Sequence, residues 1–357
     1  MERRVLLVGG YGVVGAQVAA MLRRHHPELR LLIAGRRKEA AEKLAGALGN
    51  AEPVSLDTHA PDPLEGVAGT LDAVVMLVHD HDDATLRSAI RRRIPYLDIT
   101  RGNSAQARAY VVTALAPPAS PVLFASNWMA GVPAILAMHL SARLAMTEAV
   151  ALSILFYGND KGGPDSEGAS DTLAEPFEAR IRGEWKKAAS MGDAVNITFP
   201  SGLERPVYRM AMADMMTLAQ ATGARDVAVR LGLDDANTGR ITSFLVRSGL
   251  WSVLQSDRMA WLRKRLSHNP TARGAPHELV VEVSGKTTGG TNASLRATVL
   301  DPAGQSHLTS VGVVANLERL LGLGCAPLRA GTAVPETSPD GTRLLALLEA
   351  EGVKVSI

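Results

Sequence analysis

The sequence predicts an α/β protein built from a doubly wound parallel sheet, followed by a central α+β domain with a mixed or antiparallel sheet. Two observations lead to this fold class. As far as about residue 126, short continuous apolar runs alternate with segments of helical spacing, which is typical of parallel strands covered by helices on both faces. After about residue 147, strand-like segments follow one another without regular helices between them, which indicates a second domain of different architecture.

The first part of the chain contains strands and helices in regular alternation. The predicted strands are residues 5–8, 31–34, 53–56, 73–78, 96–99 and 122–125. The predicted helices between them are residues 16–24, 39–48, 83–92 and 105–115. This order is that of a Rossmann domain, which binds dinucleotides at the carboxyl ends of its strands.

The central domain is predicted from a change of period. Its candidate strands are residues 150–156, 195–199, 227–231, 279–286 and 294–300, with a hairpin turn at residues 286–291 and a helical stretch at 238–266 that breaks near Gly249. Two further helices, residues 308–321 and 341–351, precede residues 353–355, which we expect to return to the first domain. The predicted Rossmann domain is therefore residues 1–146 completed by 308–357, and the substrate-binding and dimerisation domain is residues 147–307.

Composition and charge exclude several classes of protein. Apolar residues make up 46% and charged residues 21% of the chain, as in ordinary globular proteins. The 38 basic and 36 acidic side chains nearly cancel, and basic residues occur only in short runs, so we expect no nucleic-acid partner. The single cysteine, Cys325, suits a reducing compartment, and no apolar stretch resembles a secretory signal or reaches the roughly 20 residues of a membrane span. We therefore expect a cytoplasmic protein without a membrane partner.

A glycine-rich turn follows the first predicted strand and opens the first helix. Its residues are Gly10, Tyr11, Gly12, Val13, Val14 and Gly15, in the pattern Gly-x-Gly-x-x-Gly. The first glycine permits a tight turn, the second lets the backbone approach a pyrophosphate, and the third brings the helix against the strand. A merely tight structural turn is the alternative. At the first strand–helix junction of such a domain, the motif indicates a dinucleotide cofactor.

The end of the second strand indicates which dinucleotide binds. An acidic residue about twenty positions after the motif would bind the ribose 2′-hydroxyl group of NAD. Here Arg36 and Arg37 occupy that region, and no carboxylate precedes Glu39. Because guanidinium groups suit a 2′-phosphate, we predict NADP (NADPH), although one of the two arginines could instead be a solvated charge at a helix start. The further predicted cofactor-binding residues are Asp57, Val78, His79 and Thr100.

Three segments carry a resemblance to a known family. They are residues 9–15, residues 95–100 (Pro-Tyr-Leu-Asp-Ile-Thr), and residues 330–336 (Ala-Gly-Thr-Ala-Val-Pro-Glu) followed by 344–353. On these motifs the chain resembles the saccharopine dehydrogenase-like family of NAD(P)-dependent reductases. The resemblance implies a Rossmann domain completed by the C-terminal segment and a central domain for substrate and dimer contacts. It also implies hydride transfer to or from an imine, a secondary amine or a related carbonyl-derived bond.

Two positions depart from the family pattern. Members that act on saccharopine have Pro-Tyr after the fourth strand and Asp-Pro-Gly after the sixth, where this chain has His79-Asp80 and Met129-Ala130-Gly131. Ligands bind at these strand ends. We therefore expect a substrate other than saccharopine, such as a small, anionic metabolite of secondary metabolism.

The run His79, Asp80, His81, Asp82 and Asp83 contains residue types that bind metal ions. Adjacent positions on a loop rarely converge as ligands, so we expect no metal site. The run is better interpreted as an exposed helix N-terminus that Asp82 or Asp83 caps.

Candidate residues for chemistry follow the fifth and sixth strands or lie in the central domain. The predicted catalytic residues, which would supply or hold a proton, are Asp98, Tyr157 and Asp171. The predicted substrate-binding residues are Arg101, Asn127, Trp128, Arg209 and Lys286. For Asp98 a structural hydrogen-bond acceptor is an equal alternative, and for the central-domain residues the alternative is a surface or salt-bridge role.

Together these features predict an NADPH-dependent oxidoreductase that reduces an imine or forms a secondary amine. Enoyl or carbonyl reduction on the same scaffold and a non-catalytic NADP-binding sensor are the alternatives. The large apolar side chains of the stretch 238–266, such as Phe244 and Trp251, also predict a homodimer formed by the central domain. Burial of these side chains within one chain is the alternative.

Overall fold

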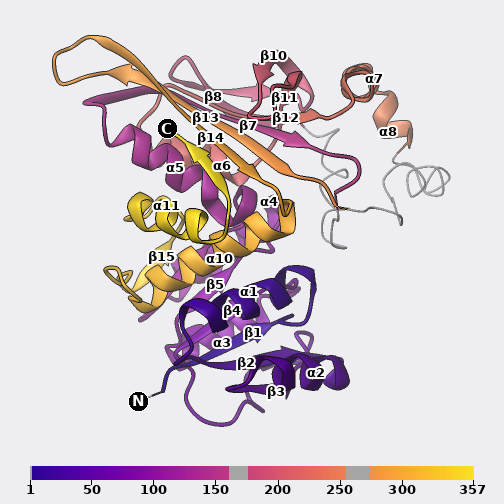
Figure 1. Ribbon diagram of the computed structural model, residues 1–357, viewed down its shortest axis with the longest axis vertical. Helices are drawn as coiled ribbons and strands as arrows, with labels where there is room; N and C mark the ends of the chain where they lie inside the picture. Colours follow the sequence, from indigo (N-terminus) through magenta and orange to yellow (C-terminus); the bar gives the residue numbers. More distant parts are fainter. Residues whose placement is uncertain (1, 161–175, 255–273) are drawn as a thin grey trace. The chain divides into compact units, whose positions relative to one another are not determined.

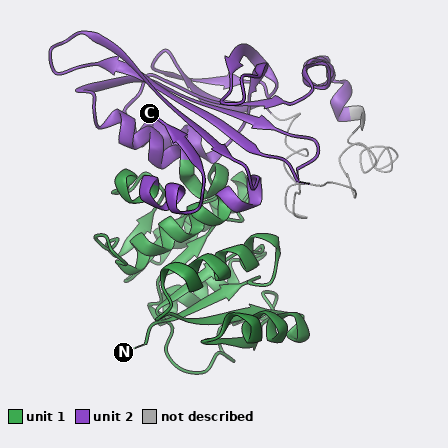
Figure 2. Ribbon diagram, in the orientation of Figure 1, with its two compact units in different colours: residues 1–132, 309–344 green, residues 133–308, 345–357 purple. Residues whose placement is uncertain are grey.

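The chain divides into two compact units. The computed structural model describes residues 2–160, 176–254 and 274–357 (Figure 1). Unit 1 consists of Met1–Val132 and Thr309–Leu344, and unit 2 of Pro133–Leu308 and Leu345–Ile357 (Figure 2). The sequence predicts boundaries at residues 146 and 307, whereas residues 133–146 and 345–357 fall in unit 2.

Unit 1 contains a seven-stranded sheet in which every pairing is parallel. Its strands, in spatial order, are β15 (Gly331–Ala333), β6 (Pro121–Phe124), β5 (Tyr96–Asp98), β4 (Ala73–Met76), β1 (Arg4–Val8), β2 (Arg30–Gly35) and β3 (Ala51–Ser55). The helices that alternate with them along the chain are α1 (Val13–His25), α2 (Lys38–Leu48), α3 (Ala84–Arg92) and α4 (Asn103–Leu115). The doubly wound parallel sheet predicted from the sequence is confirmed.

The strand order of this sheet reverses between β1 and β4. The chain adds strands outward from β1 to β3 on one side and from β4 to β6 on the other. Residues 5–7 and 31–34 are completely buried, which explains why the first two predicted strands are apolar at every position rather than at alternate ones. In sheets of this kind, ligands bind at the carboxyl ends of the strands beside the reversal.

Unit 2 contains a seven-stranded mixed sheet. In spatial order its strands are β10 (Gly192–Thr198), β11 (Glu204–Arg209), β12 (Asp226–Leu233), β7 (Met146–Phe156), β13 (His277–Lys286), β14 (Asn292–Asp301) and β16 (Lys354–Ser356). The β12–β7 pair is parallel and the other pairs are antiparallel, so the predicted α+β domain is confirmed. Its remaining elements are the hairpin of β8 (Phe177–Ile181) and β9 (Glu184–Ala188), and the helices α5 (Val132–Ser141), α6 (Ala213–Thr222), α7 (Ala236–Arg247) and α8 (Leu250–Leu254).

The C-terminal segment contributes a strand to each sheet. After α10 (Gln305–Leu321), β15 pairs in parallel with β6 of unit 1. After α11 (Gly341–Ala350), β16 pairs with β14 of unit 2, so the expected return of residues 353–355 to the first domain is replaced by pairing in the second sheet. The short strand β15 has the sequence Gly-Thr-Ala, which carries no local strand signal and was not predicted.

The long helical stretch of the central domain is interrupted where the sequence predicts. Helix α7 ends before Gly249, whose φ of +78° lies in the left-handed region that favours glycine, and α8 begins after it. Residues 255–266 of the predicted stretch lie outside the described residues. In the described parts of the chain, no helix combines the length and the apolar character needed to cross a bilayer.

Candidate functional site

The glycine-rich turn after β1 is tight because two of its glycines have no room for a side chain. Gly9 has a φ of +82°, and a Cβ there would lie 2.5 Å from Cγ1 of Val78, at the end of β4. A Cβ on Gly15 would collide with the carbonyl oxygen of Gly9. The turn therefore packs against the ends of its own strand, its helix and the neighbouring strand, as the predicted motif requires.

Helix α1 begins at this turn, and the backbone N–H groups of its first three residues have no acceptor within the helix. The first intrahelical hydrogen bond is donated by Ala16 N–H to Gly12 O at 2.9 Å, so the N–H groups of residues 13–15 precede the helix's own acceptors. Gly12, the N-cap residue, has no side chain that could cap them. A helix N-terminus of this kind, preceded by glycines that allow close approach, is suited to a pyrophosphate.

The other predicted cofactor residues lie at the same carboxyl edge of the sheet. Asp57 follows β3 and is exposed, and its Oδ1 accepts the backbone N–H of His59 at 3.0 Å. The carbonyl oxygen of Val78 accepts the Thr100 hydroxyl at 3.2 Å, which joins the ends of β4 and β5. His79 is exposed, and its ring meets that of His81 edge-on at 6.0 Å.

Arg36 and Arg37 follow β2, and both side chains are exposed. The Arg37 guanidinium lies over the Tyr11 ring, 5.0 Å from its centroid. Among the described residues, neither arginine forms a salt bridge with a carboxylate. The end of β2 thus carries two exposed positive charges without a carboxylate partner among the described residues.

Arg101, a predicted substrate anchor, is the centre of a buried charged cluster after β4 and β5. Its side chain is 2% exposed, and its Nε donates to Asp98 at 2.7 Å. Its terminal nitrogens contact Asp83 and lie 3.3 Å from Asp80 and 3.2 Å from the Tyr96 hydroxyl. The guanidinium group is thus occupied by partners of its own unit.

Asp98, a predicted catalytic residue, has both carboxylate oxygens occupied in the same cluster. Oδ1 accepts the backbone N–H of Thr100 at 2.8 Å and its hydroxyl at 2.9 Å, and Oδ2 accepts Tyr96 at 2.9 Å and Arg101. Asp98 is completely buried. This geometry corresponds to the structural hydrogen-bond acceptor, one of the two roles left open by the sequence.

Asp80 caps helix α3. Its carboxylate accepts the N–H groups of Thr85 at 3.1 Å and Leu86 at 2.9 Å. The predicted cap, Asp82 or Asp83, is therefore wrong: Asp83 adopts a left-handed conformation without a capping hydrogen bond and turns to Arg101. Burial raises the pKa of Asp80.

In the part of the chain that the structure describes, no group of three or more His, Cys, Asp or Glu side chains could hold a metal ion.

Asn127, one of the two predicted residues after β6, contacts the C-terminal segment within unit 1. Asn127 is buried and its Nδ2 lies 3.5 Å from Oε1 of Glu336, while Trp128 begins the short helix η1 (Trp128–Gly131). Met129 and Ala130 both have a φ of +49°, and Asn316 holds the Ala130 carbonyl oxygen at 2.6 Å. The segment 330–336 thus supports the end of β6.

Tyr157 lies at the end of β7 in unit 2. Its hydroxyl donates to Oε1 of Glu278 at 2.6 Å, and Oε2 of Glu278 accepts the N–H of Ser201 at 2.8 Å. Burial, followed by the hydrogen bond to Glu278, raises the pKa of Tyr157 to about 12. Glu278 is completely buried and was not predicted from the sequence, although an ionisable residue next to the apolar run 279–281 is the signal that could have identified it.

Arg209 and Lys286, the other predicted anchors in unit 2, lie in different surroundings. Arg209 is 7% exposed and donates to Asp193 at 2.8 and 3.2 Å and to the Val227 carbonyl oxygen at 2.9 Å. Lys286 is exposed at the far end of β13 from Glu278, a span of roughly 26 Å for extended chain. The structure does not bring Lys286 and Tyr157 together. Asp171 lies outside the described residues.

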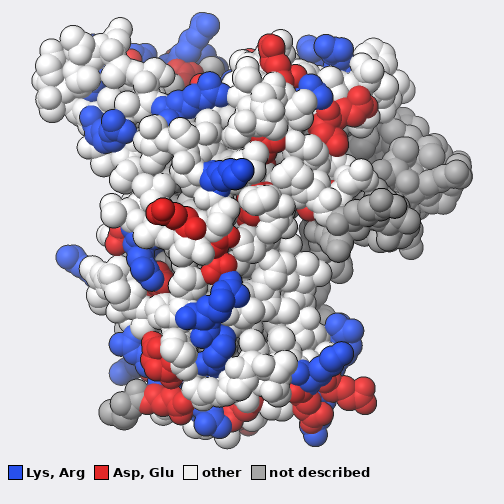
Figure 3. All heavy atoms as spheres, viewed as in Figure 1, with Lys and Arg blue, Asp and Glu red and all other residues white. Residues whose placement is uncertain are grey.

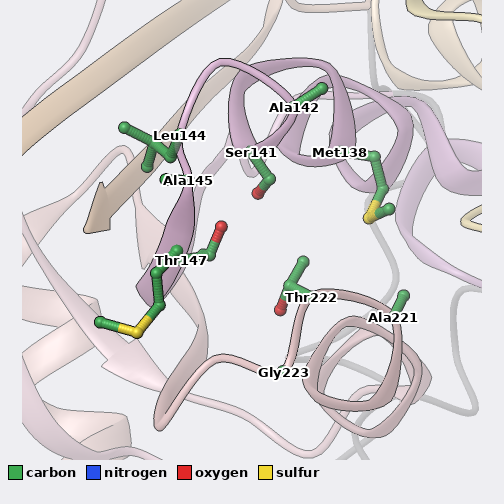
Figure 4. Close-up of a pocket in the computed structure, with 10 residues that line it drawn as sticks. Met138, Ser141, Ala142, Leu144, Ala145, Thr147, Ala221, Thr222 and Gly223 are labelled. Carbon is green, nitrogen blue, oxygen red and sulfur yellow. The ribbon is translucent and has the colours of Figure 1, made fainter. Parts of the chain in front are cut away.

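A pocket of about 450 Å³ lies within unit 2, between the ends of α5 and α6 and the start of β7. The hydroxyl groups of Ser141 and Thr147 face its interior (Figure 4), and the Thr222 hydroxyl donates to the Leu218 carbonyl oxygen at 2.6 Å. None of the predicted site residues lines it. On the face of the molecule in Figure 3, acidic and basic side chains are interspersed rather than gathered into a patch of one sign.

The fold and the edge of its parallel sheet define a Rossmann-type dinucleotide-binding protein with a second, mixed-sheet unit. Residues 5–118 match the family model of the saccharopine dehydrogenase NADP binding domain. Residues 5–118 are thus similar to the NADP binding domain of saccharopine dehydrogenase, which agrees with the resemblance noted in the sequence.

Two solved structures share the fold over nearly the whole chain. Saccharopine dehydrogenase (L-Glu forming) from Saccharomyces cerevisiae has a TM-score of 0.70 at 14% identity, covering 99% of this chain and 100% of that chain. Homospermidine synthase from Legionella pneumophila, in complex with NAD, has a TM-score of 0.66 at 11% identity, covering 99% and 91%. Identities this low show a common fold. No curated protein matches the sequence.

Proposed function

We propose that the protein is an NADPH-dependent oxidoreductase that reduces an imine, or forms a secondary amine, on a small anionic metabolite. The observation that carries the cofactor part is the pair Arg36 and Arg37, exposed after β2 and without a carboxylate partner among the described residues. The family of the first domain supports a nicotinamide dinucleotide in the same place. The reaction class follows from the family resemblance.

The residues of the chain have separate roles under this proposal. When bound, NADPH supplies the hydride, and a protonated imine accepts it without a strong protein acid. The N–H groups at the start of α1 would hold the pyrophosphate, and Thr100, fixed by Asp98 and the Val78 carbonyl oxygen, would border the nicotinamide. We assign Asp98 and Arg101 as positioning residues because their partners are already in place.

Among the described residues of unit 2, we propose that Tyr157 holds a proton for the substrate. With a pKa of about 12 its hydroxyl remains protonated at neutral pH, and Glu278 fixes its direction. Asn127 and Trp128 are proposed to contact substrate, whereas Lys286 lies at the opposite end of β13 from Tyr157 and is left out of this site. Arg209 is bound to Asp193, so its contribution would be to hold that carboxylate in place.

Isotope transfer tests the proposal. NADPH deuterated at the transferable position is incubated with the enzyme and a pool of imines formed from amines and oxoacids, and products are analysed by mass spectrometry. Deuterium on the carbon of a C–N bond supports imine reduction, whereas deuterium on a former C=C or C=O carbon favours enoyl or carbonyl reduction. Tight NADPH binding without turnover of any class favours the sensor. A lower dissociation constant for NADH than for NADPH would contradict the cofactor assignment.

We also propose a homodimer formed through helix α7. The helix turns its small residues inward: Gly239 packs near Tyr208, and the Ser243 hydroxyl donates to Met191 O at 2.7 Å. Ile241 and Phe244 are 59% and 65% exposed, which is unusual for large apolar side chains on a helix. Light scattering should give twice the 37.7 kDa mass of one chain, and Phe244→Glu should return it to 37.7 kDa. A wild-type particle of single-chain mass would contradict the dimer.

A further inference from the structure

The Tyr11 side chain reaches from the glycine-rich turn to the end of β2. Its ring lies directly over Gly35, the last residue of that strand. A Cβ on Gly35 would lie 2.5 Å from the Tyr11 hydroxyl oxygen, 2.6 Å from Cε1 and 2.7 Å from Cζ. Gly35 is buried, so the ring fills the space that any side chain at this position would need.

Tyr11 also makes two contacts with Arg37. The backbone N–H of Arg37 donates to the Tyr11 hydroxyl oxygen at 2.9 Å. The guanidinium group of the same residue lies 5.0 Å from the centroid of the Tyr11 ring, within the range of a cation–π interaction. One side chain of the phosphate-binding turn therefore fixes both the backbone and the charge of Arg37.

These contacts concern the position that distinguishes the two nicotinamide dinucleotides. In NAD-binding Rossmann domains an acidic residue at the end of the second strand binds the ribose 2′-hydroxyl group. Here the ring of Tyr11 leaves no room for a carboxylate at position 35. A guanidinium that is already held in place also loses less conformational freedom when it binds a phosphate.

We propose that Tyr11 is a specificity-determining residue for the cofactor: its ring excludes a ribose-binding carboxylate at position 35 and holds Arg37 for the 2′-phosphate. The inference rests on the proposed NADPH preference and deepens it. It distinguishes the two arginines: in the described part of the chain Arg36 forms no hydrogen bond or cation–π contact with Tyr11, whereas Arg37 forms one of each. Tyr11 should therefore act through Arg37 and independently of Arg36.

A binding experiment with cofactor fragments isolates this effect from catalysis. Adenosine 2′,5′-bisphosphate and 5′-AMP differ by the 2′-phosphate alone, and calorimetry on the full chain gives the ratio of their dissociation constants. Tyr11→Ala should reduce the preference for the bisphosphate by about tenfold, and Tyr11→Phe, which keeps the ring but not the hydroxyl acceptor, by about two- to threefold. The melting temperature of each variant shows whether it is folded.

A double-mutant cycle tests the route through Arg37. Tyr11→Ala should change the preference little when Arg37→Ala is already present, and should retain its full effect when combined with Arg36→Ala. Equal effects of Tyr11→Ala in both backgrounds would overturn the inference, because the ring would then act without Arg37.

A second cycle tests the exclusion of the carboxylate. Gly35→Ala and Gly35→Asp should each weaken both fragments by about tenfold or more, since their Cβ meets the Tyr11 ring. Tyr11→Ala combined with Gly35→Asp should restore 5′-AMP binding and reverse the preference. Strong 5′-AMP binding by Gly35→Asp with Tyr11 intact would overturn the exclusion.

The wild-type protein separates failure of this inference from failure of the proposed function. If it binds the two fragments equally, the NADPH preference is wrong and the inference falls with it. If the wild type prefers the bisphosphate and Tyr11→Ala keeps that preference unchanged, only the role of Tyr11 is overturned.

Discussion

Two groups of arginines follow strands of the same parallel sheet, and they differ in burial and in their salt-bridge partners. Arg101, after β5, is 2% exposed and surrounded by Asp80, Asp83 and Asp98. Arg36 and Arg37, after β2, are exposed and form no salt bridge with any described carboxylate. A buried guanidinium must be compensated by fixed partners of its own chain, while an exposed one needs none and stays available to a ligand.

The number of carboxylate partners therefore separates the buried arginine from the two that we propose to bind the cofactor at the same sheet edge. In sequence the two are alike, since each is a basic residue just after an apolar run. The surrounding carboxylates give a weak indication: Asp80 and Asp83 lie in the loop after β4 and Asp98 ends β5, whereas no carboxylate precedes Glu39 after β2. We expect substitutions in the two groups to affect different properties of the protein.

Removing the buried charge should have the largest effect. Arg101→Met keeps much of the side-chain length but leaves three buried carboxylates without their cation, which should lower the free energy of unfolding by about 3–5 kcal/mol. The matched control is Arg36→Met, which should change it by less than about 0.5 kcal/mol. Urea unfolding measures both. Similar values for the two variants would show that the cluster around Arg101 is not a structural unit.

Removing the exposed charges should affect cofactor binding instead. Arg36→Ala combined with Arg37→Ala should raise the dissociation constant of NADPH by about ten- to hundredfold, because charge-assisted hydrogen bonds to the 2′-phosphate are lost. NADH binding should stay nearly constant. The control is Arg91→Ala with Arg92→Ala, a second exposed pair at the end of α3 that contacts Asp62. Equal weakening of NADPH and NADH would refute a 2′-phosphate site.

Removing the N-cap of α3 should lower the free energy of unfolding by an intermediate amount. The capping residue, Asp80, is part of the buried cluster around Arg101. Asp80→Asn weakens the acceptor for the N–H groups of Thr85 and Leu86 and removes one charge near Arg101. The free energy of unfolding should fall by about 1–2 kcal/mol. Asp82→Asn, at an exposed neighbouring position, is the control and should be nearly neutral. A larger effect of Asp82→Asn would restore the cap predicted from the sequence.

The elements that could be predicted from sequence are those with a strong local signal. All six strands predicted in the first domain are present. Burial on both faces makes β1, β2 and β4 apolar at nearly every position, whereas β3 is partly exposed and contains Glu52 and Ser55. The strands β8, β9 and β11 were not predicted: β9 is Glu-Trp-Lys-Lys-Ala with charges at alternate and adjacent positions, and β11 contains Pro206. Their pairing partners, rather than their own composition, make them strands.

The candidate site divides in the same way. The glycine-rich turn and the two arginines after β2 depend on local geometry and could be located from spacing. The partners of Arg101 are 3 to 21 positions away in sequence, and Glu278 is 121 positions from Tyr157. Contacts of this separation leave no periodic signal in one sequence, so the structural roles of these residues follow only from the fold.

His307 is less buried than Arg101 and less exposed than Arg36 and Arg37. Replacing it should give the smallest of these effects, a change in how the stability of the fold depends on pH. Its side chain is 16% exposed, its Nδ1 lies 2.7 Å from Asp301, and its Nε2 lies 3.6 Å from Glu351. The hydrogen bond with Asp301 raises the pKa of His307 above the usual 6.5. A raised folded-state pKa means that protonated His307 stabilises the fold fully below about pH 6.5, and that this contribution is lost as pH rises through the folded pKa.

His307→Gln removes the charge but keeps a polar side chain, so the melting temperature of the wild type should exceed that of the variant more at pH 5.5 than at pH 8.5. Working above pH 5 keeps most carboxylates ionised, so the comparison reports the histidine. Asp301→Asn should remove the same pH dependence, because the acceptor that raises the pKa is then neutral. A difference between wild type and His307→Gln that is constant over this range would place His307 with the exposed charges, which contribute little to stability whether or not they are ionised.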